Sequence, residues 1–317
     1  MVTTPLGKKE RKYRDKDPLP EISGPRNKKT LADYILVLFF IFMIFIMFAP
    51  MMNILARSLS DAQALSLNEV GLLPVGINFD AYQIIFRDAS LTRSMWFTGL
   101  LTVVAVIVSM TLTISVAFPL TYDNLKGRRA FSIFMILTMY FSAGLIPFFL
   151  LMRDLNLLNS FWVLVIPNAL SVFNVIIMRA FFFSIPHSLK EAAEVEGANP
   201  LQVLLRIYLP LSTPVLATLT LFYAVGRWNG FADALMFIDP AHSHLHPIQL
   251  FLWRLLQAQT NIEAAAMEGF AGTAWSGGLT MSLRAATIIV ATVPILLLYP
   301  WLQKYFISGV TLGAVKE

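Results

Sequence analysis

The 317-residue sequence contains no cysteine and is poor in charge. Without cysteine the chain can form no disulfide bond, and it offers no thiolate for metal binding or nucleophilic catalysis. Only 14% of the residues are charged and 57% are hydrophobic, whereas roughly 25% are charged in a typical soluble domain. This composition indicates a protein whose main surroundings are the lipid bilayer.

Motifs for enzymatic chemistry are also absent. The sequence has no G-x-x-x-x-G-K-[ST] loop, whose backbone amides and lysine would hold the phosphates of a nucleotide. No Ser/His/Asp set, pair of catalytic carboxylates or G-x-G-x-x-G loop stands out. We therefore expect that this chain is not an enzyme.

One histidine-rich segment has a spacing that metals use. His242, His244 and His246 alternate, so they would share one face of an extended strand. The flanking Pro240 and Pro247 favour a solvated turn instead. We therefore expect neither a metal nor a cofactor bound by this chain.

Six long uncharged runs dominate the sequence. A helix needs about 20 apolar residues to cross the hydrocarbon core of a bilayer. The first run is too long for the apolar part of a signal peptide and follows a polar tail, so we expect it to remain as a membrane anchor. The sequence thus predicts an all-α polytopic membrane protein with six transmembrane helices, at Tyr34–Leu55, Met95–Leu120, Ala130–Met152, Phe161–Met178, about Pro214–Ala232 and Ala285–Gln303.

Lysine and arginine are distributed unevenly between these runs. Residues 1–33 hold nine of the 24 basic residues, and Lys126, Arg128 and Arg129 crowd the link between the second and third runs. Because cytoplasmic segments carry the excess of positive charge, we expect both to face the cytoplasm. The net charge of +5 then reflects topology, and no nucleic acid is implied. The predicted organisation is a cytoplasmic basic tail (1–33), a six-helix domain (34–306) and a cytoplasmic C-terminal tail (307–317).

The segment 185–210, IPHSLKEAAEVEGANPLQVLLRIYLP, follows the fourth run and is predicted to be cytoplasmic. Ser188 and Glu191 match an S-x-x-E capping box, so a helix should begin there. Gly197 can adopt a left-handed conformation and end this helix.

A second short helix is predicted to follow. Asn199 and Pro200 can serve as its cap and first residue, and Pro210 should close it. Its apolar face is expected to contain Leu201, Leu204, Leu205 and Tyr208.

The residues alone leave two interpretations of this helix pair open. It could lie under the membrane as an interfacial element. Alternatively, Ala192 and Ala193 would let a partner surface approach the first helix closely. Charge on that helix would come from Glu191, Glu194 and Glu196.

A longer pattern favours the partner surface. The pattern is Glu191-Ala192-Ala193, three residues, Gly197, nine residues, and then Ile207, Leu209 and Pro210. It resembles the EAA loop of binding-protein-dependent ABC importer permeases at all seven specified positions, with Glu196 where many relatives have aspartate. The resemblance implies a type I ABC importer permease fold in the cytoplasmic membrane of a bacterium. It also implies that these residues and Glu196 dock on an ATPase subunit and transmit closure of the ATPase dimer to the spans.

The resemblance implies several partners. The complete importer would contain this chain, a homologous second permease, two cytoplasmic ATPase subunits and an extracytoplasmic solute-binding protein. ATP and Mg²⁺ would be bound by the ATPase subunits. Two outer segments, about Ser58–Ser94 and Asp233–Arg284, would suit contact with the solute-binding protein. The second segment is expected to contain an amphipathic helix, Pro247–Ala258.

Other stretches resemble the carbohydrate-uptake class, in particular the second permease of maltose-type pairs. The resemblance implies import of an oligosaccharide, and it favours oligosaccharides that contain uronate. Alternatives are another solute, such as a phosphorylated polyol or a peptide, or an unrelated six-span channel or membrane enzyme. The last would leave the EAA pattern unexplained. The similar stretches are Ile146-Pro147 through Leu157-Leu158-Asn159-Ser160, Trp228-Asn229-x-Phe231 and the ending from Lys304 to Lys316.

Polar residues in the fifth span are candidates for the substrate path. Arg227, Trp228 and Asn229, with Phe231 beside them, would suit a sugar through hydrogen bonds and stacking, and Arg227 could pair with a uronate. In the alternative, Arg227 reaches the outer headgroups, Trp228 joins the aromatic belt and Asn229 bonds a neighbouring helix.

The fourth span carries three further polar candidates. Asn168, Ser171 and Asn174 are spaced by three after Pro167, so they would form one stripe on a helix. Such a stripe could line the path or hold helices together, and both interpretations are open.

Overall fold

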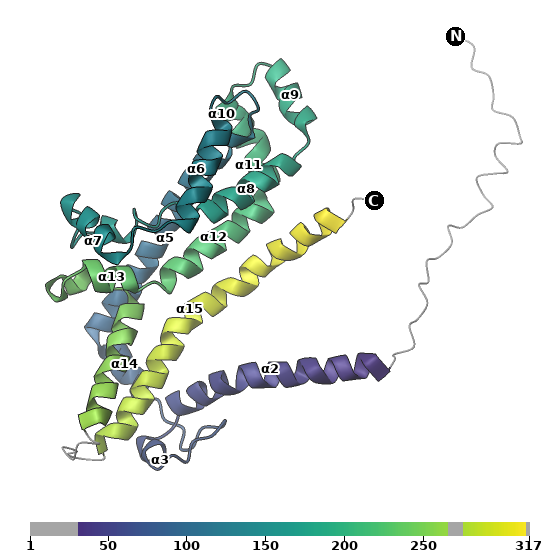
Figure 1. Cartoon of the computed structure of the whole chain (residues 1–317). Helices are drawn as coiled ribbons and strands as arrows, with labels where there is room; N and C mark the ends of the chain where they lie inside the picture. Colours follow the sequence, from purple (N-terminus) through teal and green to yellow (C-terminus); the bar gives the residue numbers. More distant parts are fainter. Residues whose placement is uncertain (1–30, 266–274, 315–317) are drawn as a thin grey trace, which may run out of the picture. The chain divides into compact units, whose positions relative to one another are not determined.

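The computed structural model describes residues 31–265 and 275–314, and every regular element in these ranges is helical (Figure 1). The chain divides into two compact units, Met1–Met51 and Met52–Glu317, which are described separately. The longer helices are α2 (Leu31–Ser58), α5 (Ala89–Ala117), α6 (Arg128–Tyr140), α7 (Leu145–Asp154), α8 (Val172–Ser184), α12 (Thr213–Trp228), α14 (Ile248–Ala265) and α15 (Trp275–Ala314). Shorter elements are α3 (Ala62–Ser66), α4 (Asp80–Arg87), η1 (Pro119–Thr121), η2 (Phe161–Leu164), α9 (His187–Val195), α10 (Pro200–Val203), η3 (Leu204–Tyr208), α11 (Leu209–Leu211), α13 (Ala232–Phe237) and η4 (Pro240–Leu245).

Three stretches in the described residues are long and apolar enough to cross a membrane alone. They are α2, α5 with η1, and Gly278–Leu297 within α15. Three bent pairs pass the same test together: α6 with α7, α8 with α9, and residues 200–211 with α12, which bend by 115°, 74° and 84°. The described chain therefore has up to six candidate spans, in agreement with the all-α polytopic fold predicted from sequence.

The part of α2 in the first unit exposes its apolar side chains on all sides. Phe40, Phe45 and Phe48 are each more than half exposed, and the predicted span Tyr34–Leu55 lies within this helix. Such a surface is stable only against lipid or another protein. Apart from Leu31 to Asp33, the predicted N-terminal tail lies outside the described residues.

The third predicted span is not one helix. α6 ends at Tyr140 and α7 begins at Leu145. Gly144 between them has φ +89° and ψ 173°, a conformation essentially restricted to glycine. Pro147 lies in the first turn of α7, where its missing N–H breaks no hydrogen bond, whereas it would disrupt a continuous helix. The expectation of an unbroken helix over 130–152 is therefore wrong.

The fourth predicted span, Phe161–Met178, is also wrong in its bounds. Its first part is the short 3-10 helix η2, and α8 begins only at Val172. Pro167 explains the difference, because proline lacks the N–H that a helix interior needs and disfavours a helical conformation in the residue before it. Ser171 caps α8, its Oγ accepting a bond from the Asn174 N–H at 3.4 Å. Asn168 and Ser171 thus precede the helix, and the predicted helical stripe does not form.

A buried core packs α14 against α5. The backbone N–H of Ile248 donates to the Oγ1 of Thr98 at 2.8 Å, and both residues are buried. α14 extends beyond the helix predicted at Pro247–Ala258, and α15 begins before the predicted Ala285. α15 also continues to Ala314, so most of the predicted tail 307–317 is helical, while residues 315–317 lie outside the description.

Candidate functional site

The first helix of the predicted docking loop is α9, and its start differs from the prediction. It begins at His187 with Pro186 at the cap position, and no side chain caps it. Ser188 is already inside the first turn, so the predicted Ser188–Glu191 capping box is not formed. The S-x-x-E spacing is present, but the helix starts two residues too early for it, with Pro186 and not Ser188 at the cap position.

Gly197 ends α9 as predicted. Its φ is +85°, in the left-handed region, and its N–H donates to the carbonyl of Glu194 at 3.0 Å. The next N–H, of Ala198, donates to the carbonyl of Ala193 at 2.9 Å. These two bonds form a Schellman motif, which satisfies carbonyls at the helix end and turns the chain sharply.

The second helix begins as predicted. The Oδ1 of Asn199 accepts from the N–H of Gln202, and the Oε1 of Gln202 accepts from the N–H of Asn199, both at 2.9 Å. Pro200 occupies the first helical position. The capping box and the Schellman motif therefore fix both sides of the bend between α9 and α10.

The apolar face of the second helix differs from the expected one. Tyr208 is buried, but Leu201 and Leu205 are 62% and 53% exposed, and Val203 is buried instead. Residues Leu204–Tyr208 form a π-helix, whose wider turn brings Val203 and Tyr208, five apart, onto one face. The helix ends at Leu211, one residue beyond Pro210.

One side of α9 is held by the rest of the chain. The Nζ of Lys190 lies 3.6 Å from the centroid of the Tyr122 ring and 3.8 Å from Glu194, and the Lys190 side chain is only 12% exposed. Ala193 packs against the buried core. These contacts fix the orientation of the helix, and α9 lies at the same end of the second unit as α10 (Figure 1).

The other side of α9 is open. No residue of this helix is buried, and Val195 is 89% exposed. We call Leu189, Glu191, Ala192 and Val195, all exposed, the open face. Glu196, Gly197 and Pro210 are exposed too, whereas Ile207 and Leu209 pack against the core behind the helix. The EAA pattern thus divides into an exposed first part and a largely supporting second part.

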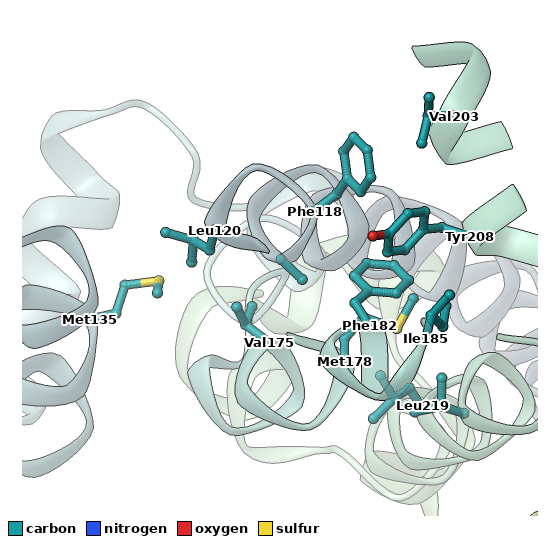
Figure 2. Close-up of a cluster of buried hydrophobic side chains, with 12 residues drawn as sticks. Phe118, Leu120, Met135, Val175, Met178, Phe182, Ile185, Val203, Tyr208 and Leu219 are labelled. Carbon is teal, nitrogen blue, oxygen red and sulfur yellow. The ribbon is translucent and has the colours of Figure 1, made fainter. Parts of the chain in front are cut away.

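An aromatic cluster connects α9 with the membrane helices. We define it as Phe118, Tyr122, Phe182 and Tyr208, and Figure 2 shows three of these rings facing one another. Ring centroids are 5.4 Å apart for Phe118 and Tyr122, 5.2 Å for Phe118 and Tyr208, and 5.3 Å for Phe182 and Tyr208. The edge-to-face geometry is the favourable one for aromatic pairs. The cluster joins the ends of α5 and α8 to the π-helix.

A polar cavity of about 430 Å³ lies among α5, α8, α12 and the segments preceding α8 and α13. Nη1 of Arg227 is 3.2 Å from Oδ2 of Asp233, which also accepts from Nδ2 of Asn168 at 2.8 Å. The Tyr223 hydroxyl bonds Oγ1 of Thr113 at 2.7 Å and accepts from the Ser171 N–H at 3.2 Å. The cavity is therefore lined by amide and hydroxyl groups and by one ion pair, Arg227–Asp233, whose charges balance each other.

Four of the predicted substrate-path candidates line this cavity: Asn168, Ser171, Asn174 and Arg227. Among the lining residues that were missed, Tyr223 and Asp233 make the polar contacts described above. Tyr223 carried a sequence signal, since it lies one helical turn before Arg227 on the same face. Asp233 had a weaker one, as the nearest acidic residue after Arg227.

The other three predicted substrate-path residues lie outside the cavity lining. Trp228 is buried, and its Nε1 donates to the carbonyl of Ala291 at 2.9 Å, which joins α12 to α15. Asn229 is exposed at the end of α12. Phe231 stacks on Trp253 with centroids 5.9 Å apart. In this structure their contacts are with the protein itself.

The histidine-rich segment is a compact 3-10 turn, η4, rather than a strand. His246 is buried, and its Nδ1 is 3.1 Å from Nη1 of Arg254. Burial and then the Arg254 charge hold the pKa of His246 below its ordinary value. Among the described residues, no three His, Cys, Asp or Glu side chains have metal-binding geometry.

Known proteins resemble the chain over most of its length. The family model "Binding-protein-dependent transport system inner membrane component" matches residues 93–312. The polygalacturonan/rhamnogalacturonan transport system permease protein YtcP of Bacillus subtilis (strain 168) is 35% identical over 291 residues, 91% of this chain and 99% of that protein. Protein LplC of the same organism is 36% identical over 269 residues, 84% and 88% of the two chains.

A solved structure extends the likeness to the fold. The structure of a bacterial ABC transporter involved in the import of the acidic polysaccharide alginate contains a chain 33% identical to this one. It superposes with a TM-score of 0.77 and covers 87% of this chain and 98% of that chain. The ABC importer permease fold expected from the EAA loop is thereby confirmed. The chain is a transport subunit and not itself an ATPase. It belongs to the binding-protein-dependent ABC transporter permeases, as a multi-pass component of the inner membrane.

Proposed function

We propose that this chain is the second permease of an ATP-driven oligosaccharide importer, and that the open face of α9 docks on an ATPase subunit. The observation that carries the proposal is α9 itself, which is held on one side by Lys190 and Ala193 and left uncovered on the other. A helix fixed in orientation but exposing Leu189 and Val195 is suited to a groove on a partner.

The proposed assembly also contains a homologous permease, two cytoplasmic ATPase subunits and an extracytoplasmic solute-binding protein. ATP and Mg²⁺ bind to the ATPase subunits. Both termini face the cytoplasm, as the basic residues of the N-terminal segment and of Lys126 to Arg129 favour. The segments 58–94 and 233–284 then face outward and are available to the solute-binding protein.

In the proposed mechanism, the aromatic cluster transmits movement of α9 to the spans. Closure of the ATPase dimer moves α9, and Lys190 carries Tyr122 with it because the two groups are in contact. Rings packed at these distances move together, since close-packed interiors transmit strain. The movement reaches α12 through Val215 and Leu219, which belong to the same core. The Tyr223–Thr113 bond continues this link from α12 to α5 at the cavity.

The proposed cargo is an oligosaccharide that contacts the cavity. Its amides and hydroxyls match the hydroxyl groups of sugars, and the names of the relatives refer to polygalacturonan and alginate. A uronate carboxylate would compete with Asp233 for Arg227, whose side chain is only 11% exposed. We therefore propose that acidic oligosaccharides are carried, with exchange of this ion pair.

The test is uptake by the complete importer reconstituted in proteoliposomes with its solute-binding protein. A labelled trigalacturonate is compared with a neutral trisaccharide, a phosphorylated polyol and a peptide. ATP-dependent accumulation of the trigalacturonate supports the proposal. Accumulation of only the polyol or the peptide contradicts the proposed cargo.

A further inference from the structure

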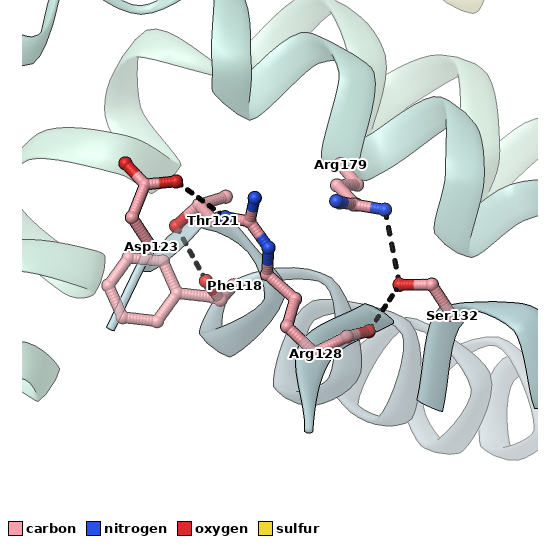
Figure 3. Close-up of polar contacts among 6 residues, drawn as sticks. All are labelled: Phe118, Thr121, Asp123, Arg128, Ser132 and Arg179. Carbon is pink, nitrogen blue, oxygen red and sulfur yellow. Dashed lines mark hydrogen bonds and ion pairs between the residues drawn. The ribbon is translucent and has the colours of Figure 1, made fainter. Parts of the chain in front are cut away.

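A basic cluster lies where α6 begins and α8 approaches its end. We define it as Lys126, Arg128, Arg129 and Arg179. Figure 3 shows Arg179 and Arg128 on either side of Ser132, whose Oγ accepts from Nη1 of Arg179 at 3.4 Å and donates to the Arg128 carbonyl at 2.8 Å. The cluster therefore bridges two helices, and it takes no part in the docking face or in the cavity.

The positive charge of this cluster is only partly balanced. Nη1 of Arg128 pairs with Asp123 at 2.7 Å, and this is the one ion pair the structure shows for the cluster within the described residues. The Nε of Arg179 is buried and has no hydrogen-bond partner there. Its guanidinium also lies 5.2 Å from the centroid of the Phe183 ring. Burying part of a cation that has no ion pair is costly unless a negative charge lies nearby.

The surroundings favour a lipid over a soluble anion. Arg128 is the first residue of α6, and Arg179 is five residues before the end of α8, about 7.5 Å along the helix. Both therefore lie near the membrane surface, where headgroups are found. The same two helices expose large apolar side chains that suit acyl chains: Phe131, Ile133 and Phe134 on α6 and Phe173, Ile176 and Phe183 on α8.

We propose that the basic cluster binds the phosphate of an anionic phospholipid in the cytoplasmic leaflet, with the acyl chains along α6 and α8. The proposal rests on the orientation proposed above. The headgroup phosphate pairs with the guanidinium groups of Arg128 and Arg179, and its charge balances the cations of the cluster that have no ion pair within the described residues. By joining Arg179 to Arg128, the headgroup braces α6 against α8. Three buried residues of α8, Val175, Met178 and Phe182, belong to the core that supports α9.

The test measures lipid retention and not uptake. A negative result would therefore contradict the lipid site and leave the proposed cargo unaffected. The complete importer is purified from nanodiscs of phosphatidylglycerol and phosphatidylcholine, and native mass spectrometry counts the lipids retained per complex. Arg128→Gln and Arg179→Gln should each weaken phosphatidylglycerol binding about fivefold, as expected for one basic residue near a headgroup. Arg179→Lys keeps the charge and should retain most of the binding. Arg153→Gln is the matched control, because Arg153 is exposed and pairs with the adjacent Asp154.

A variant that is expected to bind more phosphatidylglycerol tests the proposal independently. Asp123 is 73% exposed, so Asp123→Asn should not disturb folding, and it frees Arg128 for the phosphate. Retention of phosphatidylglycerol should then rise. If Arg179→Gln does not assemble, Arg128→Gln and Asp123→Asn decide the question. Equal retention of the two lipids by the wild type, or variants indistinguishable from Arg153→Gln, would overturn the proposal. Loss of the partner permease with an unchanged lipid count would also overturn it and assign the cluster to a protein contact.

Discussion

At the scale of single residues, Gly197 makes the clearest prediction. A Cβ at this position would meet nothing within 4 Å, so alanine there is strained only by its φ of +85°. Gly197→Ala should cost about 1–2 kcal/mol and loosen the bend after α9. ATPase subunits that co-purify with the permease should decrease. Gly99→Ala is the control, because its Cβ also meets open space but its φ is ordinary, and an equal loss in both variants would contradict the account.

Arg227 and Asp233 predict a change in cargo preference. Arg227→Gln removes a charge-assisted bond to a carboxylate, so the kcat/KM for an acidic oligosaccharide should fall about tenfold or more relative to a neutral one. Asp233→Asn releases Arg227 and should shift the same ratio the other way. Uptake of both cargoes by one preparation gives the ratio. If both variants leave it unchanged, the ion pair has no part in selection.

Trp228 is expected to affect stability rather than cargo. Its ring is buried and its Nε1 bonds Ala291, so Trp228→Ala should destabilise the chain by about 3–5 kcal/mol. Trp228→Phe keeps most of the packing and should cost much less. Thermal unfolding of the purified complex measures both effects. A change in cargo preference at unchanged stability would return Trp228 to the substrate path.

Sequence reasoning at this scale succeeded where one residue has one strong local preference. Gly197 and Asn199 could be placed because few other conformations suit a left-handed glycine and an Asn-Pro cap. Ser188 was misplaced, since its capping pattern competed with Pro186, which sets the helix start. Trp228 illustrates another limit: its partner, Ala291, is 63 residues away, and no local pattern encodes that contact.

At the scale of elements, the aromatic cluster predicts uncoupling without dissociation. Tyr122→Leu removes the ring between Lys190 and Phe118, a contact worth about 1 kcal/mol. The sugar imported per ATP should fall about fivefold, while the ATPase subunits still co-purify. Tyr140→Leu is the control, because Tyr140 is 78% exposed. If Tyr122→Leu imports as much cargo per ATP as the wild type, the aromatic cluster does not transmit the movement of α9.

The elements also show what periodicity cannot predict. An expected repeat of 3.6 residues assigned Leu201 and Leu205 to the buried face, but the π-helix Leu204–Tyr208 shifts the register after Val203. The breaks at Gly144 and Pro167 had visible signals in the residues themselves. The spans were predicted from the length of the uncharged runs instead. Hydropathy indicates which residues lie in lipid, but it does not show whether the helix is continuous.

At the scale of the whole molecule, the proposed function requires partner subunits. The chain belongs to an ABC importer family, yet no nucleotide-binding loop occurs in its sequence. The family and the two-helix bend at Gly197 were predictable because the EAA pattern is long and its spacing fixed. The cavity was predictable only in part, since Asn168 and Arg227 meet through Asp233 across 65 residues of chain.

The most direct test of the central claim is the accessibility of α9 in the assembled importer. Because the chain has no cysteine, a single one can be introduced as Val195→Cys on the open face or as Leu73→Cys, where the native side chain is 72% exposed in the outer segment. Maleimide labelling of each is compared with and without the ATPase subunits. The account predicts that assembly protects position 195, slowing its labelling about tenfold or more, as for a buried hot spot, and leaves position 73 unchanged. Equal labelling of position 195 in both states would contradict docking through α9.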